Sequence, residues 1–125
     1  CLFGCHVGCG EGRYDSIQHY AFCPVVIDFA IQHLLLPQSC VGSIMNFLCL
    51  NRDVPEELRI LQLLLLFAVY SATNCLRFTR PRPNMFSMSE FLLQYVHQGA
   101  SQSAAAQQAV HQRCTRRRNV RQRAE

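Results

Sequence analysis

Several features of secreted chains are missing from this 125-residue sequence. No basic region followed by an apolar stretch stands at the N-terminus, which argues against a signal peptide. Eight cysteines are present, but turn residues are few and leucine-rich runs are long, which disfavours a secreted disulfide scaffold. We therefore expect a reducing, intracellular environment. The chain begins with Cys1 rather than methionine, and we expect it to be a piece of a longer polypeptide.

Lysine is also absent, and all twelve basic residues are arginines. We attribute this to coding bias, although arginine does contact phosphate groups well. The net charge is +4, and half of the arginines lie in the last thirteen residues. The C-terminal end therefore carries the net charge. Its run of arginines indicates a solvated segment, a nuclear-localisation patch or a contact with nucleic acid.

Alternating apolar and polar residues do not form a run of useful length, so no strand is predicted and the fold class is mainly α. We expect a small zinc-knuckle nub followed by a short helical bundle over residues 1–80, and an extended linker over residues 81–86. An accessory helix over residues 87–110 and a disordered basic tail over residues 111–125 follow. Half of the residues are hydrophobic, which is enough for one core at this length.

Short helices are expected over residues 15–23, 25–36 and 40–50, with Pro24 interrupting or restarting the chain between the first two. Asp15 is the expected first N-cap, and Gln18 completes a capping box with it. An amphipathic helix is predicted over residues 87–98, capped by Ser87 or Ser89 and carrying a stripe of apolar side chains. That stripe consists of Phe91, Leu92, Tyr95 and Val96.

The longest predicted helix runs from about Pro55 to Phe78, with Asp53 as its N-cap. It contains "ILQLLLLFAVYSATNCL", an uncharged run between Arg59 and Arg77. A membrane helix needs about 20 apolar residues, and this run is shorter and contains four polar side chains. We expect a buried core helix, and a membrane helix over residues 60–76 is the alternative.

Cysteine and histidine are concentrated in the first 23 residues, "CLFGCHVGCGEGRYDSIQHYAFC". His19 and Cys23 are four residues apart and share one face of the predicted helix. A tetrahedral zinc site requires two more ligands, and these come from Cys1 and Cys5 or from Cys5 and Cys9. The second pair is favoured by the shorter loop to His19. The predicted zinc ligands are Cys5, Cys9, His19 and Cys23, and ordinary core packing or a disulfide are the alternatives.

The segment "CGEGRYDSIQHYAFCPVV", residues 9–26, resembles the zinc knuckle near the C-terminus of non-LTR (LINE-type) retrotransposon reverse transcriptases. "DSIQH" matches the start of the knuckle helix and Cys23-Pro24 matches its close. Both the Cys pair and the His–Cys pair depart from the family spacing by one residue. A "YADD"-like aspartate pair and a nuclease carboxylate cluster are absent, so the resemblance implies a non-catalytic region of a parent RNA-directed DNA polymerase.

The resemblance implies that this region binds RNA or DNA mainly through phosphate contacts, while a structural Zn²⁺ ion orients the knuckle. Neutralising several phosphates gives salt-dependent affinity with little sequence preference. A helical protein-interaction module without metal is the remaining alternative. The candidate nucleic-acid contacts are Arg13, Arg77, Arg80, Arg82, Arg116, Arg117 and Arg118.

Overall fold

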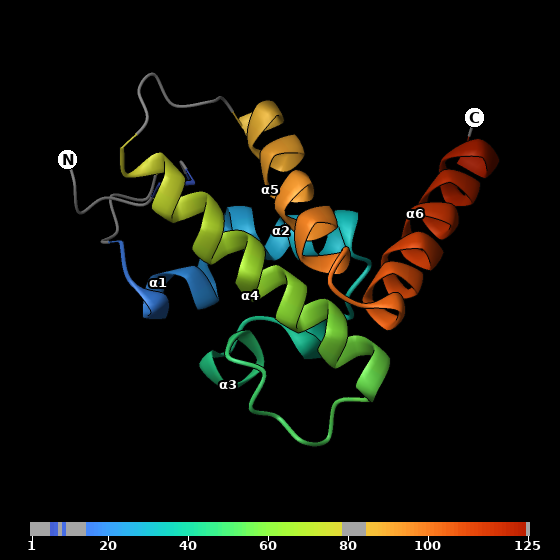
Figure 1. Cartoon of the computed structure of the whole chain (residues 1–125), viewed down its shortest axis with the longest axis horizontal. Coiled ribbons are helices and arrows are strands. Elements are labelled where there is room, and N and C mark those ends of the chain that lie inside the picture. The colour runs from blue at the N-terminus through green and yellow to red at the C-terminus, as the bar shows by residue number, and fades with distance from the viewer. Residues whose placement is uncertain (1–5, 8, 10–14, 79–84, 125) are drawn as a thin grey trace.

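Helices make up nearly all of the regular structure (Figure 1). The computed structural model describes residues 6, 7, 9, 15–78 and 85–124. These residues contain six α-helices, one short 3-10 helix and no strand, which confirms the mainly α class. The predicted linker lies largely outside the described residues.

Two short helices, α1 (Ile17–Phe22) and α2 (Pro24–His33), meet at Cys23, which ends the first and caps the second. Pro24 occupies the first turn of α2, where its missing N–H costs nothing, so the predicted restart of the helix at Pro24 is confirmed. The predicted N-cap of α1 is wrong. Ser16 is the cap, and its hydroxyl accepts a 3.1 Å hydrogen bond from the His19 N–H.

The segment predicted as one helix over residues 40–50 is broken into a 3-10 helix, η1 (Gln38–Cys40), and a single turn, α3 (Ile44–Phe47). Gly42 has a φ of 76°, which a right-handed helix does not allow. The Ser43 hydroxyl then caps the new turn by accepting the Asn46 N–H at 3.0 Å. The prediction of one longer helix was therefore wrong, because a glycine and a capping serine interrupt it.

The predicted long helix is confirmed as α4 (Glu56–Leu76), which crosses the middle of the molecule. Its N-cap is Pro55 rather than Asp53. Nine of its residues are buried, including Gln62 and Thr73. Gln62 Nε2 donates to the Cys40 carbonyl at 2.9 Å, and the Thr73 hydroxyl donates to the Val69 carbonyl at 2.8 Å. Each polar side chain therefore has a partner inside the core.

By length and composition α4 also satisfies the criteria for a membrane-spanning helix, as the central helix of a soluble core does. One side of it remains exposed. Leu63, Phe67 and Tyr70, spaced along a single face, are 54%, 39% and 66% exposed.

Helix α5 (Met85–Ala100) packs along α4 and makes the largest helix–helix contact in the described chain. Leu92 and Val96, from the predicted apolar stripe, are fully buried. The two helices approach closely at Gly99, where an added Cβ would lie 2.8 Å from the Phe67 ring. The predicted caps Ser87 and Ser89 lie inside the helix rather than at its start.

The predicted accessory helix over residues 87–110 is broken after Ala100, and residues 104–124 form one continuous helix, α6 (Ala104–Ala124), where a disordered tail was predicted from residue 111. The Ser103 hydroxyl caps it by accepting the Ala106 N–H at 3.0 Å. Ala106 and Val110 are buried and anchor its first half. Arginine, alanine and glutamine, which dominate its sequence, are all good helix formers.

Candidate metal centre and basic surface

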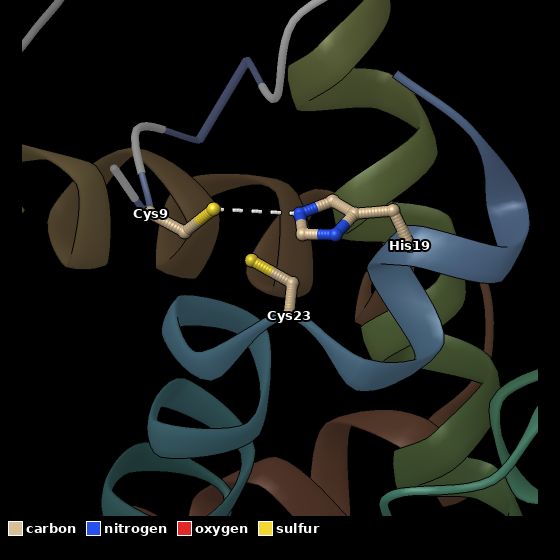
Figure 2. Close-up of side chains that lie close together, drawn as sticks. All are labelled: Cys9, His19 and Cys23. Atoms are coloured by element: carbon tan, nitrogen blue, oxygen red, sulfur yellow. Dashed lines mark hydrogen bonds between the residues drawn. The ribbon is translucent and has the colours of Figure 1, made fainter. Parts of the chain in front are cut away.

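Three predicted ligands, Cys9, His19 and Cys23, come together from three parts of the chain (Figure 2). Cys9 belongs to the N-terminal segment, His19 to α1, and Cys23 to the junction between α1 and α2. The cap at Ser16 starts α1 so that His19 and Cys23 lie one turn apart on the same side. The structure thus brings these three predicted residues into one group, which is the arrangement the spacing predicts.

The separations between the ligand atoms suit a tetrahedral zinc ion. Bonds of about 2.3 Å to sulfur and 2.05 Å to nitrogen place a sulfur and a nitrogen about 3.6 Å apart, and two sulfurs about 3.8 Å apart. Cys9 Sγ and His19 Nε2 are 3.5 Å apart, and the three ligand atoms all lie within 4.8 Å of one another. A contraction of about 1 Å at most would bring all three to zinc-bound distances.

Helix geometry also favours metal binding by Cys23. Its side chain is completely buried, while Cys9 and His19 are half-buried. Cys23 is the N-cap of α2, and the positive end of a helix dipole favours a thiolate there. No disulfide joins the cysteines of the described residues.

The predicted ligand Cys5, like the alternative Cys1, lies outside the described residues. No further His, Cys or carboxylate from the described ranges joins the group. His6 is 1% exposed, and its Nε2 atom lies 3.1 Å from Asp15 Oδ2.

Asp15 is the centre of a polar network that fastens the N-terminal segment to the core. Its Oδ1 atom accepts the Tyr20 hydroxyl at 2.7 Å, and its Oδ2 atom accepts Arg77 Nε at 2.8 Å. The Tyr20 oxygen in turn accepts the His6 backbone N–H at 3.1 Å. Sequence reasoning gave Asp15 the role of a helix cap, and the structure uses it for tertiary contacts.

The network also governs the ionisation of Asp15. Burial by itself disfavours the carboxylate, but the hydrogen bonds from Arg77 and Tyr20 outweigh it, so the pKa of Asp15 is lowered from 3.8. Arg77 is therefore engaged in an ion pair, and it also contacts the side chain of Asn74. This position argues against the predicted role of Arg77 as a phosphate contact.

The arginines of α6 fall into two groups. Arg113 and Arg117 are half-buried and face the end of α2, where they donate to the Leu35 carbonyl at 3.4 Å and to His33 Nδ1 at 2.6 Å. The predicted contact Arg117 is thus an internal anchor. The exposed group contains the predicted contacts Arg116 and Arg118 together with Arg121 and Arg123.

The contact between Arg117 and His33 requires a neutral imidazole, because a guanidinium has no acceptor and Nδ1 must supply the lone pair. Burial lowers the pKa of His33 from 6.5, and the charges of Arg117 and Arg121 lower it further. Burial also lowers the pKa of Arg117. The partners are 84 residues apart in sequence, so no local pattern signals the contact.

Arg13, Arg80 and Arg82 lie outside the described residues, so the structure does not place these predicted contacts. No family model matches the chain, and no curated protein or solved structure is significantly similar to it. The resemblance to retrotransposon reverse transcriptases therefore remains a prediction from the sequence.

Proposed function

We propose that this chain is a non-catalytic nucleic-acid-binding accessory region, held in shape by a structural zinc ion. The remainder of the parent polypeptide, by resemblance an RNA-directed DNA polymerase of a retroelement, supplies the catalysis. Cys9, His19 and Cys23 hold the ion with Cys5, and four protein ligands leave no open position for a reacting water. The metal therefore stabilises the N-terminal segment and orients α1.

The distribution of charge on α6 carries the proposal. Arg116, Arg118, Arg121 and Arg123 are exposed, and no acidic residue lies between Ala104 and Ala124 to neutralise them. The helix holds these guanidinium groups on a fixed scaffold, because Arg113 and Arg117 anchor it to α2. Such a surface attracts phosphates and releases their counterions, which gives salt-dependent binding to RNA or DNA.

The test is a salt titration of binding to labelled oligonucleotides by fluorescence anisotropy. The full chain is compared with a variant carrying glutamine at Arg116, Arg118, Arg121 and Arg123, and with Arg52→Gln as a control. Arg52 is exposed but belongs to the connection before α4. Each lost phosphate contact is expected to flatten the plot of log affinity against log salt by about 0.7 to 0.9.

Two outcomes contradict the proposal. One is the absence of binding at about 50 mM salt, a concentration at which electrostatic binding is strong. The other is an unchanged salt dependence in the four-arginine variant, which would place the binding surface elsewhere. Circular dichroism of the variant checks that α6 remains helical, and Arg52→Gln is expected to bind as the unaltered chain does.

A second candidate function uses the apolar face of α4. Leu63, Phe67 and Tyr70 are exposed along one side of a helix long and apolar enough to cross a membrane. A membrane-associated protein, or an interaction module that buries this face against another protein, would explain that exposure. Carbonate washing of membranes from cells that express the chain distinguishes the first case, because an integral protein stays in the pellet.

A further inference from the structure

A groove of about 900 Å³ lies between the C-terminal half of α5 and the length of α6. The two helices meet at a short connection after Ala100 and then diverge toward the C-terminus, as Figure 1 shows. The groove occupies the inside of this V, and α6 contributes one face to it. The α6 side chains on that face include His111, Cys114, Arg117, Arg118 and Arg121.

The lining combines apolar side chains from both helices with cationic side chains from α6. The apolar side chains include Leu93, Ala100 and Val110, and none of the lining residues is acidic. Arg118 and Arg121 are exposed on the α6 side, toward the open end of the V. His97 from α5 and His111 from α6 contribute an imidazole ring from each wall. The groove therefore suits a ligand with both anionic groups and flat apolar rings.

We infer that this groove binds a short single strand of nucleic acid, with its phosphates on Arg118 and Arg121 and an unpaired base against the imidazoles of His97 and His111. The inference rests on the proposed function. It adds where on the chain the nucleic acid binds and that the bound form is a single strand. Unpaired bases stack on histidine as well as on larger aromatic rings. In a duplex the base faces are already stacked and unavailable.

The dimensions agree with a strand of a few nucleotides. A helix rises 1.5 Å per residue, so His111 and Arg121 are separated by about 15 Å along the axis of α6. A stacked single strand that kept the 3.4 Å spacing of one duplex strand would place about four nucleotides along that length, which is the lower limit of the site sizes seen per OB fold.

A duplex does not fit the same site. Each helix with its side chains is about 10–12 Å across, and the major groove of DNA is about 12 Å wide. The α5–α6 pair is therefore too broad to enter it, and Arg113 and Arg117 hold α6 against the end of α2. A duplex would contact the outer surface of α6, meaning the surface outside the groove, where Arg116 and Arg123 line a separate hollow beside Leu35.

The inference is tested with the full chain and three fluorescein-labelled probes of one mixed sequence: a 12-nucleotide RNA, the same sequence as single-stranded DNA, and the DNA duplex. Arg118→Gln removes a charge inside the groove, and Arg116→Gln removes one two residues away, outside the groove. A double variant, His97→Ala with His111→Ala, removes both rings and leaves the arginines in place. Arg52→Gln is the control for loss of one remote charge.

Arg118→Gln is expected to weaken binding of the single strands at least fivefold, and to do so more than Arg116→Gln. The double histidine variant is expected to weaken single-strand binding at least fivefold and to leave duplex binding unchanged. A difference in affinity between the RNA and the single-stranded DNA shows whether a ribose hydroxyl is recognised as well. The inference holds whichever of the two strands binds more tightly.

Equal losses for Arg116→Gln and Arg118→Gln, together with unaltered binding by the double histidine variant, would overturn the groove as the site. In that case salt-dependent binding through the outer surface of α6 would still stand. Absence of binding to all three probes would instead overturn the proposed function itself. Circular dichroism confirms that each variant is folded before its affinity is compared.

Discussion

The guanidinium of Arg77, next to the last residue of α4, donates a 2.8 Å hydrogen bond to the carboxylate of Asp15, next to the start of α1. The two residues are 62 positions apart in sequence. The Asp15 side chain is only 7% exposed, whereas the Arg77 side chain is 38% exposed. One partially buried ion pair thus links the candidate metal centre to the central helix.

We predict that Arg77→Met destabilises the protein by about 1–3 kcal/mol, because it leaves a nearly buried carboxylate without its charged partner. Asp15→Asn in the same background is expected to recover part of that loss. Urea denaturation of the two single variants and the double variant gives their coupling energy, expected to be about 0.5–3 kcal/mol.

The pH dependence of the coupling energy between Asp15 and Arg77 supplies the control for this ion pair. The pKa of Asp15 is lowered from 3.8 in the folded protein, so its stabilising contribution is present above that value and is lost as the pH falls through the folded pKa. The coupling energy should therefore shrink at pH values below 3.8. Strictly additive losses at neutral pH would contradict the assignment.

The sequence predicts α4 and the pairing of His19 with Cys23 because both depend on local pattern. A long uncharged run between arginines predicts the helix, and four-residue spacing predicts the shared face. Asp15 and Ser16 are adjacent and equally good caps, so sequence alone does not assign the role. Only the fold brings Arg77 within reach of Asp15 and leaves the cap to Ser16.

The C-terminal helix illustrates the same limit. Its arginine-rich sequence indicates a solvated tail when read by itself, since it has little apolar surface with which to anchor. The structure supplies anchors from far along the chain, because Arg113 and Arg117 contact Leu35 and His33. The contact between α2 and α6 decides which arginines face solvent, and this division is invisible in the sequence.

A second prediction concerns the pH dependence of the contact between His33 and Arg117. The pKa of His33 is lowered in the folded state, so the unfolded chain binds a proton over the interval between the folded pKa and 6.5 while the folded chain does not. Stability is therefore expected to fall as the pH decreases through that interval and to change no further below it.

The comparison of the unaltered chain with His33→Phe measures this effect. The substitution keeps a ring beside Phe29, on which His33 stacks with centroids 5.0 Å apart, but removes the titrating group. The difference in free energy of unfolding between pH 7.5 and 5.5 should be smaller in the variant. Any contribution of metal binding at His19 is common to both proteins and cancels. An identical pH dependence would contradict the prediction.

A third prediction follows from the backbone after α2. Leu35 has a φ of 51°, in the left-handed region, and Leu36 N–H donates to the Ala30 carbonyl at 3.1 Å to close the helix. This is a helix-ending motif that usually contains glycine. Leu35→Gly and Leu35→Ala lose the same packing, but alanine retains the backbone strain, so the glycine variant should be more stable by about 1 kcal/mol.

Thermal and urea unfolding of the two variants measure that difference directly. Leu34→Ala and Leu34→Gly form the matched control pair, because Leu34 has an ordinary right-handed conformation with a φ of −93°. At that position alanine should be the more stable of the two. An advantage for alanine at both positions would show that the left-handed conformation of Leu35 carries no strain.

The final prediction identifies the zinc ligands. Native mass spectrometry is expected to find one zinc ion per chain, and Cys9→Ser, His19→Ala and Cys23→Ser are each expected to lose it, because all three ligand atoms lie within 4.8 Å of one another. Structural zinc contributes binding free energy on the order of 10 kcal/mol to folding. Loss of Cys23 should therefore unfold the N-terminal segment.

Variants of the two remaining N-terminal cysteines, Cys1 and Cys5, decide which of them completes the site. Cys5→Ser is expected to abolish zinc binding, and Cys1→Ser is expected to leave it intact, because the favoured pair of turn ligands is Cys5 and Cys9. Loss of zinc in Cys1→Ser but not in Cys9→Ser would assign the other pair. Because Cys9 Sγ already lies 3.5 Å from His19 Nε2, close to the sulfur–nitrogen edge of a zinc tetrahedron, we expect Cys9 to be required.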